Sequence, residues 1–229
     1  MTGPKNYQIE ILDHLSDVSA LDWNALLSPD AGPFLRYEFL SALEETGCVG
    51  NQTGWQVAHL ALKQDGQLIG AIPLYLKQHS YGEFVFDWSW AQAYEQQGMN
   101  YYPKVLCAIP FTPVQGSRIL CLPQSNESEI QNVLIGGLKS LLNENGLSSA
   151  HILFPMATEA KALKEQGFLL RDSVQFHWHN QDFQSFEQFL SVLTMKRRKN
   201  IRREREQVAR EAIVFRHVPG KESTAVSYT

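Results

Sequence analysis

The chain has 229 residues, 44% of them hydrophobic and 19% charged, which suffices for one large domain or two small ones. No apolar run reaches the roughly 18–20 residues of a membrane span, and the start lacks the basic and apolar regions of a secretory signal. Cys48, Cys107 and Cys121 lie far apart without a CxxC spacing. We therefore expect a reduced, cytoplasmic protein without a metal site.

The net charge of −4 conceals an uneven distribution along the chain. Residues 1–195 carry 10 Lys and Arg against 20 Asp and Glu, whereas residues 196–229 carry 10 against 4. Such a division indicates a partner of opposite charge or a domain junction, and it carries no information about the fold.

In chain order, the hydrophobic pattern predicts a mixed α/β domain with a central hairpin. Asp65-Gly66 predicts the hairpin turn, and Pro73 predicts an edge or a bulge in its second strand. The predicted strands cover 7–12, 55–63, 67–77, 104–111, 117–122, 149–155, 168–180 and 213–218, and the predicted helices lie around 21–26, 34–47, 88–97, 128–143, 158–167 and from 185 through the basic run.

Residues 79–103, called the aromatic segment below, combine large rings with ionisable side chains. Residues 79–111 hold nine of the 25 aromatic side chains, and His79, Glu83 and Asp87 stand among them. One interpretation is a hydrophobic core built from large rings. The other is a ligand pocket, since carboxylates and imidazole next to apolar rings have shifted pKa values. The residues alone leave both interpretations open.

A basic run, TMKRRKNIRREREQVAREA (194–212), places eight Lys and Arg within residues 196–210. One interpretation is a solvent-exposed or domain-bridging helix stabilised by i,i+4 pairs such as Arg202 with Glu206. The other is a site for phosphate or RNA, because cations crowd the helix start, where the helix dipole is also positive.

Other motifs are weak or absent. His177 and His179 of the HWH sequence are expected to face solvent as a pair, and Cys107 is expected to be inert inside a buried strand. The sequence contains no GxGxxG, Walker, GxSxG or HExxH motif.

Three stretches of the chain resemble one family. KQHSYGEFVFDWSWAQAYEQQGMNYYPKVLCAIPFTPVQGSRIL (77–120), LRYEFLSALEETGCVGNQTGWQVAHLAL (35–62) and KRRKNIRRERE (196–206) are similar to the FemAB-like predicted N-acyltransferases, also called the peptidoglycan biosynthesis/recognition family, of the GNAT superfamily. The resemblance implies a GNAT-like mixed sheet flanked by helices over residues 1–183, with the aromatic segment as an insert, followed by basic linker helices over 184–212.

The resemblance also implies a chemistry, in which an amine attacks an activated acyl carbon while a general base removes the amine proton. The donor would be acyl-CoA or an aminoacyl-tRNA, and the acceptor a small molecule or a cell-wall precursor amine. Our site hypothesis takes Glu83 or Asp87 as the proton acceptor with His79 assisting. Tyr81, Trp88, Trp90, Tyr101 and Tyr102 would line the substrate pocket, and Arg197, Arg198, Arg202 and Arg203 would hold a donor phosphate.

The sequence departs from the family pattern in two places. The GNAT pyrophosphate loop is missing, since the equivalent region reads PVQGSRILCLPQSNESEI. Residues 213–229 are expected to be the start of a second GNAT-like half that is missing, or a frayed tail. Two alternatives to an active transferase follow: a catalytically incomplete remnant without its donor half, and an RNA-binding module acting through the basic helix.

Overall fold

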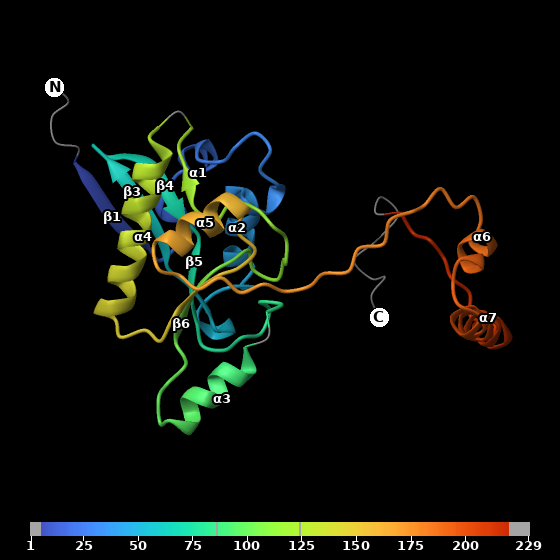
Figure 1. The fold of residues 1–229 in the computed structure, drawn as a ribbon. Coiled ribbons are helices and arrows are strands. Elements are labelled where there is room, and N and C mark those ends of the chain that lie inside the picture. The colour runs from blue at the N-terminus through green and yellow to red at the C-terminus, as the bar shows by residue number, and fades with distance from the viewer. Residues whose placement is uncertain (1–5, 86, 124, 220–229) are drawn as a thin grey trace. The chain divides into compact units, whose positions relative to one another are not determined.

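The computed structural model describes residues 6–85, 87–123 and 125–219, which separate into two compact units, Met1–Arg171 and Asp172–Thr229. Residues 172–183, which the prediction placed in the first domain, fall within the second of these units. The first unit contains β1 (Tyr7–Leu12), α1 (Ala20–Ala25), α2 (Tyr37–Glu45), β2 (Trp55–Val57), β3 (His59–Gln64), β4 (Gln67–Ile72), β5 (Leu74–Lys77), α3 (Trp88–Gln96), β6 (Lys104–Cys107), β7 (Leu120–Cys121), α4 (Glu127–Glu144), β8 (Ala150–Ile152) and α5 (Ala157–Glu165) (Figure 1).

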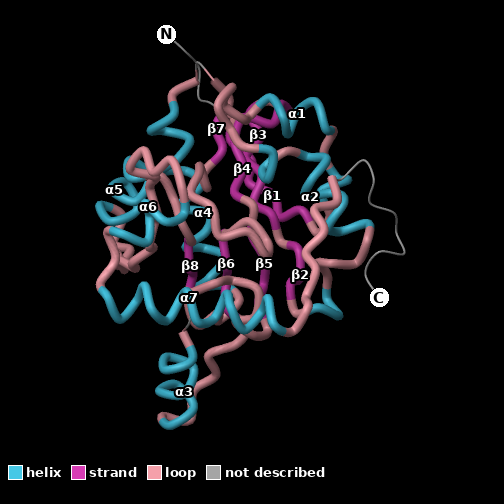
Figure 2. Tube along the Cα trace, turned by 90° about the vertical axis from the view of Figure 1, so that its right-hand side faces the viewer, coloured by secondary structure: helices cyan, strands magenta, loops and turns pink. Residues whose placement is uncertain are grey.

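These strands form two four-stranded sheets, β1-β3-β4-β7 and β2-β5-β6-β8. All pairs are antiparallel except β6 with β8, which is parallel, and Figure 2 shows β8, β6, β5 and β2 side by side. Pro73 separates β4 from β5, and the Leu74 N–H next to it donates to the ring of buried His59 at 3.1 Å. The mixed α/β fold, with helices flanking its sheets, is confirmed. At Pro73, where the sequence predicts an edge or a bulge within one strand, the chain instead passes from one sheet to the other.

Alternating side chains of β3 supply two separate cores. Leu60 and Leu62 pack with the buried face of α4, whereas Ala61 between them packs with α1 and α2. Gly70 of β4 lies under α4, where a Cβ would come within 2.7 Å of Ile130. The sheet is therefore covered on both faces, and Figure 1 shows α4 against β1, β3 and β4.

A loop at 108–119 connects β6 of one sheet to β7 of the other, and buried Arg118 holds it. Its guanidinium donates to the carbonyls of Leu153, Ser117 and Val114 at 2.6–3.0 Å. Glu159 of α5 accepts from the backbone N–H groups of Arg118, Ile119 and Met156 at 2.9–3.3 Å. The predicted strands 104–111 and 117–122 are accordingly shortened to β6 and β7.

The second unit contains α6 (Phe186–Ser191) and α7 (Met195–Arg210), which begin at the capping side chains of Ser185 and Thr194. The strands predicted at 168–180 and 213–218 are wrong, since the structure describes both ranges as irregular; residues 220–229 lie outside the described part. Phe176 is 94% exposed and Val214 88%. An alternating pattern forms a strand only where a partner strand takes up its backbone hydrogen bonds, and the described residues provide none here.

Candidate functional site

Two lysines lie opposite each other where β5 pairs with β6. The register aligns Lys77 with Lys104, and both side chains are fully buried. Like charges directly opposite in a sheet repel each other, and burial adds a desolvation penalty to each. The arrangement therefore requires counter-charges, and the aromatic segment supplies them.

Lys104 is enclosed by side chains from the aromatic segment. Its Nζ donates to Asp87 Oδ2 at 2.5 Å, to Glu83 Oε2 at 2.8 Å and to Ser80 Oγ at 2.9 Å. The side chains of Glu83 and Asp87 are each 1% exposed. All three protons of the ammonium group are engaged, so Lys104 fixes both buried carboxylates.

Each of these carboxylates also has a buried oxygen without a partner. Glu83 Oε1 and Asp87 Oδ1 have no hydrogen-bond partner among the described residues. Leaving a buried acceptor unpaired is costly, so such atoms in a folded protein need a specific explanation. Two unpaired acceptors on one ionic cluster are suited to receive a further donor.

The pKa values of the two carboxyl groups are moved in opposite directions. Burial raises the pKa of Glu83 against the opposing effect of the Lys104 ammonium. Burial also acts on Asp87, but hydrogen bonds led by that from Lys104 outweigh it and lower the pKa of Asp87. When the pKa values of two neighbouring carboxyl groups are moved apart, one group is suited to exchange a proton and the other stays ionised.

Lys77 lies at the edge of the cluster. Its Nζ donates to the Tyr81 carbonyl at 3.1 Å and sits 3.6 Å from the ring centroid of Trp55. Burial, with a smaller contribution from Lys104, lowers the pKa of Lys77 to about 7. This group therefore changes charge near neutral pH.

Two tyrosines connect the cluster to a surface pocket. Tyr101 OH donates to Asp87 Oδ2 at 2.6 Å and lies 3.2 Å from His151 Nε2, while Tyr102 OH is 2.7 Å from Ser80 Oγ. Burial lowers the pKa of His151 to about 4, so its ring is neutral. The pocket has a volume of about 420 Å³ and is lined by Trp88, Ala91, Gln92, Glu95, Met99, Asn100, Tyr101 and Tyr102.

The remaining predicted residues of the aromatic segment lie outside the cluster. Both ring nitrogens of His79 are taken up by backbone groups, Nδ1 by the Tyr81 N–H and Nε2 by the Thr53 carbonyl. Tyr81 and Trp90 are exposed and do not line the pocket, although the Tyr81 ring contacts that of Trp88 at 5.2 Å. His79 thus braces the backbone at the start of the segment.

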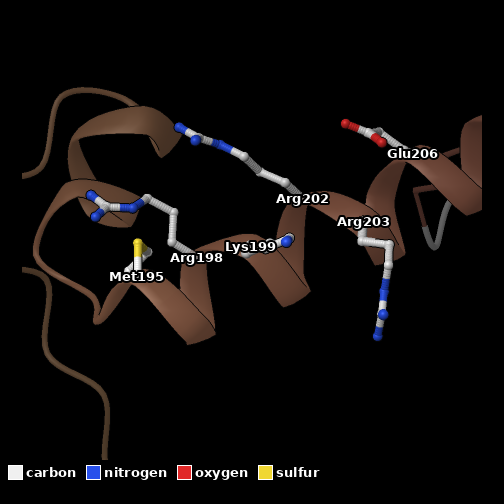
Figure 3. A pocket seen from close by; sticks show the side chains of 6 residues that line it. All are labelled: Met195, Arg198, Lys199, Arg202, Arg203 and Glu206. Atoms are coloured by element: carbon white, nitrogen blue, oxygen red, sulfur yellow. The ribbon is translucent and has the colours of Figure 1, made fainter.

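The predicted phosphate-binding arginines lie on α7. Figure 3 shows Arg203 extending away from Arg202, and a shallow pocket of about 370 Å³ is lined by Met195, Arg198, Lys199, Arg202, Arg203 and Glu206. Arg202 is paired with Glu187 at 2.5 Å, and Arg198 donates to the Ser191 carbonyl at 3.3 Å. Arg197 follows the capping residue Thr194, which accepts the Arg197 N–H.

The sequence analysis missed Lys77, Lys104, Ser80 and His151. A signal was present for the lysines, because each ends or begins a strand whose other residues are mostly apolar, and a lysine there is buried only when paired. Within the described ranges, no three His, Cys, Asp or Glu side chains gather to hold a metal ion. Burial raises the pKa of Cys107 to about 12, consistent with an inert thiol.

Solved structures with a similar chain trace are acetyltransferases. The aminoglycoside N-acetyltransferase AAC(6')-Iy in complex with CoA shares 14% identity, covering 78% of this chain and 98% of its own, with a TM-score of 0.47. A ribosomal-protein-alanine N-acetyltransferase from Brucella melitensis biovar Abortus 2308 shares 16% identity over 76% of this chain and 99% of its own, with a TM-score of 0.43. A Trypanosoma brucei acetyltransferase shares 12% identity, covering 76% of this chain and 100% of its own, also with a TM-score of 0.43.

Comparison with curated protein sequences gives no match. Among the described helices, none has the length and apolar character needed to cross a bilayer. The sequence profile of the FemAB_like family, described as peptidoglycan biosynthesis/recognition, matches residues 14–229, nearly the whole length. This protein belongs to the FemAB_like family.

Proposed function

We propose that this protein is an N-acyltransferase that transfers an acyl or aminoacyl group to an amine, with a peptidoglycan precursor as the class of acceptor. The cluster of Lys104, Glu83 and Asp87 carries the proposal, because it holds two buried carboxylates with unpaired oxygens and pKa values moved apart. The family description supports the acceptor class.

In this proposal, Glu83 is the proton acceptor. The amine nitrogen forms a bond to the acyl carbon, the bond from that carbon to the leaving group breaks, and the amine proton passes to Glu83 Oε1. A raised pKa brings the carboxylate closer to the amine in proton affinity, which makes transfer easier at neutral pH. The leaving thiolate or ribose oxygen then takes up that proton from Glu83, which restores the carboxylate.

Asp87 and Lys104 are proposed as positioning residues. Asp87 remains ionised and holds the Lys104 ammonium, which in turn fixes Glu83 at 2.8 Å. Ion pairing therefore sets the orientation of Glu83 before an amine arrives, and no reorganisation is needed at the moment of transfer.

Access to Glu83 requires movement of the aromatic segment. Glu83 is 3% exposed, whereas Tyr81 and Phe84 on either side are 66% and 55% exposed. Phe84 has a φ of 59°, a strained conformation for a residue with a side chain. We propose that the exposed side chains of Tyr81 and Phe84 move aside when the acceptor binds, while the ion pair with Lys104 keeps Glu83 in place.

Glutamine substitution in the cluster tests the proposal. The chain is incubated with acetyl-CoA or alanyl-tRNA and a precursor peptide bearing a free amine, and the acylated product is quantified by mass spectrometry. Glu83→Gln is expected to lower turnover about 10²–10⁴-fold, the usual contribution of a general base. The matched control is Glu165→Gln, since Glu165 is an exposed glutamate of α5. Wild-type turnover in Glu83→Gln would contradict the assignment of the proton acceptor, and wild-type turnover in Asp87→Asn as well would remove the whole cluster from the proposal.

The donor would be acyl-CoA or an aminoacyl-tRNA, with its phosphates held by the basic helix. Arg197, Arg202 and Arg203 lie on α7, and no ion pair is described for Arg197 or Arg203. Binding of tRNA measured between 50 and 200 mM salt should weaken steeply, and Arg197→Ala with Arg203→Ala should reduce the salt slope by about one unit for each phosphate interaction removed. CoA binding without tRNA binding would leave acyl-CoA as the donor and exclude an RNA-binding module.

A further inference from the structure

A hydrogen-bonded network runs from the buried carboxylate of Asp87 to strand β8. Tyr101 OH donates to Asp87 Oδ2 at 2.6 Å, and His151 Nε2 lies 3.2 Å from the same hydroxyl and 3.0 Å from Ser149 Oγ. The proton transfer proposed above gives Tyr101, His151 and Ser149 no role. A buried network that ends on a member of the ionic cluster is therefore the strongest place to look for a further functional residue.

The number of protons available fixes the direction of each hydrogen bond in this network. A tyrosine hydroxyl has one proton and the ionised Asp87 carboxylate can only accept, so Tyr101 directs its proton to Asp87. The Tyr101 oxygen can then only accept from His151, which places a ring proton on Nε2. Burial lowers the pKa of His151 to about 4, so the ring is neutral near pH 7 and this is its single N–H.

The residues at the start of β8 hold Tyr101 at both ends. Ser148 Oγ donates to the Tyr101 carbonyl, and His151 meets the hydroxyl. Tyr101 is 4% exposed, and its ring contacts that of Tyr94 with 5.2 Å between the centroids. Because β8 is paired with β6, the sheet sets where the Tyr101 hydroxyl lies relative to Asp87.

The network treats the two carboxylates of the cluster differently. Among the described side chains, Lys104 is the one hydrogen-bond donor to Glu83, whereas Asp87 receives both Lys104 and Tyr101. Burial acts to raise the pKa of Asp87, and hydrogen bonds that include those from Lys104 and Tyr101 outweigh it. A donor to the Tyr101 oxygen polarises its O–H bond, so His151 strengthens the hydrogen bond from Tyr101 to Asp87.

We propose that His151 is a positioning residue for acyl transfer. Acting through Tyr101, it keeps Asp87 ionised and paired with Lys104, and Lys104 in turn fixes Glu83. This role in transfer rests on the proposed function, whereas the effect of His151 on the ionisation of Asp87 can be measured without any substrate.

Other titratable or charged side chains face the network or the cluster from the turn before α3, from β5 and β6, from the end of the aromatic segment and from the residues after α5. They are Glu83, Lys77, Lys104, Tyr102 and Arg171. Burial lowers the pKa of Lys77 to about 7, so Asp87 is best followed well below that pH, where Lys77 is protonated in every variant. Glu83 is the one carboxyl group among them and is followed in the same experiment.

The test is a pH titration of the full chain by NMR, with 13C in the aspartate and glutamate carboxyl groups and no donor or acceptor present. Asp87→Asn and Glu83→Gln identify the two resonances. We expect Tyr101→Phe to raise the pKa of Asp87 by about one unit or more, since a hydrogen bond to a charged group is lost. His151→Leu should raise it by a smaller amount, and His151→Gln should largely restore it, because the amide of Gln can donate an N–H to Tyr101.

Tyr94→Phe is the matched control for the titration. It removes the same hydroxyl from a tyrosine whose ring contacts that of Tyr101, and it should leave the pKa of Asp87 unchanged. In the transfer assay, His151→Leu should lower kcat about three- to tenfold with KM nearly unchanged, because His151 does not line the pocket beside α3. His151→Gln should recover most of that loss.

The outcomes separate this role from the proposed function. An unchanged pKa of Asp87 in both Tyr101→Phe and His151→Leu would overturn it, as would equal shifts in His151→Leu and His151→Gln. Turnover that depends on Glu83 but not on His151 would overturn the positioning role alone. If the pKa of Asp87 responds as expected while the wild type transfers no acyl group, the proposed function fails and the control of Asp87 by His151 stands. Tyr101→Phe, which keeps the buried ring, decides the matter if His151→Leu does not fold.

Discussion

Two buried ionic clusters in the first unit differ in how completely they are satisfied. At Arg118, the guanidinium donates to three carbonyls, and Glu159 accepts three backbone N–H groups. At Lys104, the ammonium is fully engaged, while Glu83 and Asp87 each keep one unpaired oxygen.

The difference separates a structural role from a binding role. The polar groups of the Arg118 cluster find their hydrogen-bond partners within the protein. The cluster holds the loop at 108–119 next to α5. The Lys104 cluster carries a desolvation cost without filling all its acceptors, which makes sense if a ligand supplies the missing donor. Substitutions in the two clusters should therefore have different effects on stability and on function.

The largest effect is expected for Lys104→Met. Removing the ammonium leaves Glu83 and Asp87 as neighbouring buried charges, so the free energy of unfolding in urea should fall by about 3–5 kcal/mol at pH 7. The loss should shrink as the pH falls towards 4, because protonation of the carboxyls removes the unpaired charge. Lys161→Met, an exposed lysine of α5, serves as the control. If the free energy of unfolding fell equally at pH 7 and at pH 4, the effect would come from lost packing and not from unpaired charge.

Glu159→Ala should come next, with a loss of about 1–3 kcal/mol from backbone donors left unpaired. Glu159→Gln should lose less, because its amide oxygen can still accept from Arg118 and Ile119. Urea unfolding of the two variants measures the difference. Neither variant should lower acyl-transfer turnover under conditions where it stays folded; a loss of turnover at unchanged stability would break the distinction between the clusters.

The pH dependence of stability tests Lys77. Its pKa falls from 10.5 to about 7 on folding, so between those values the unfolded chain binds more protons, and stability rises with pH. Compared with Lys77→Met, the wild type should gain up to about 1.4 kcal/mol per pH unit over this window. Unfolding titrations at pH 7, 8 and 9 measure the slope. Parallel curves for the two proteins would show that Lys77 stays charged.

The smallest effect should come from the exposed ion pair of the second unit. Arg202 and Glu187 are 51% and 68% exposed at their side chains, so Arg202→Ala should change unfolding free energy by less than about 0.5 kcal/mol. Arg203→Ala is the control without a described ion pair. If Arg202→Ala lowered the free energy of unfolding as much as Lys104→Met does, burial would not determine how much an ion pair contributes to stability in this protein.

Local sequence patterns were sufficient to predict the helices of both units and the hairpin turn. Ser19 and Ser185 accept backbone N–H groups at helix starts, and the spacing of Ile130, Leu134, Leu138 and Leu141 puts them on one buried face of α4. Composition also brought Glu83 and Asp87 forward as candidate site residues. These features depend on neighbours within a few positions, so they are readable from the chain.

Pairing between distant segments was decided only by the tertiary structure. The register of β5 with β6 brings Lys77 opposite Lys104, and only then do Glu83 and Asp87 become the counter-charges of one cluster. His79 is near them in sequence, yet its ring is bound by the backbone of Thr53 and Tyr81. The strand expected at 168–180 is absent for a related reason, because no partner strand among the described residues pairs with it. Side-chain period reports which face a residue takes, whereas partner and register depend on contacts between segments far apart in the chain.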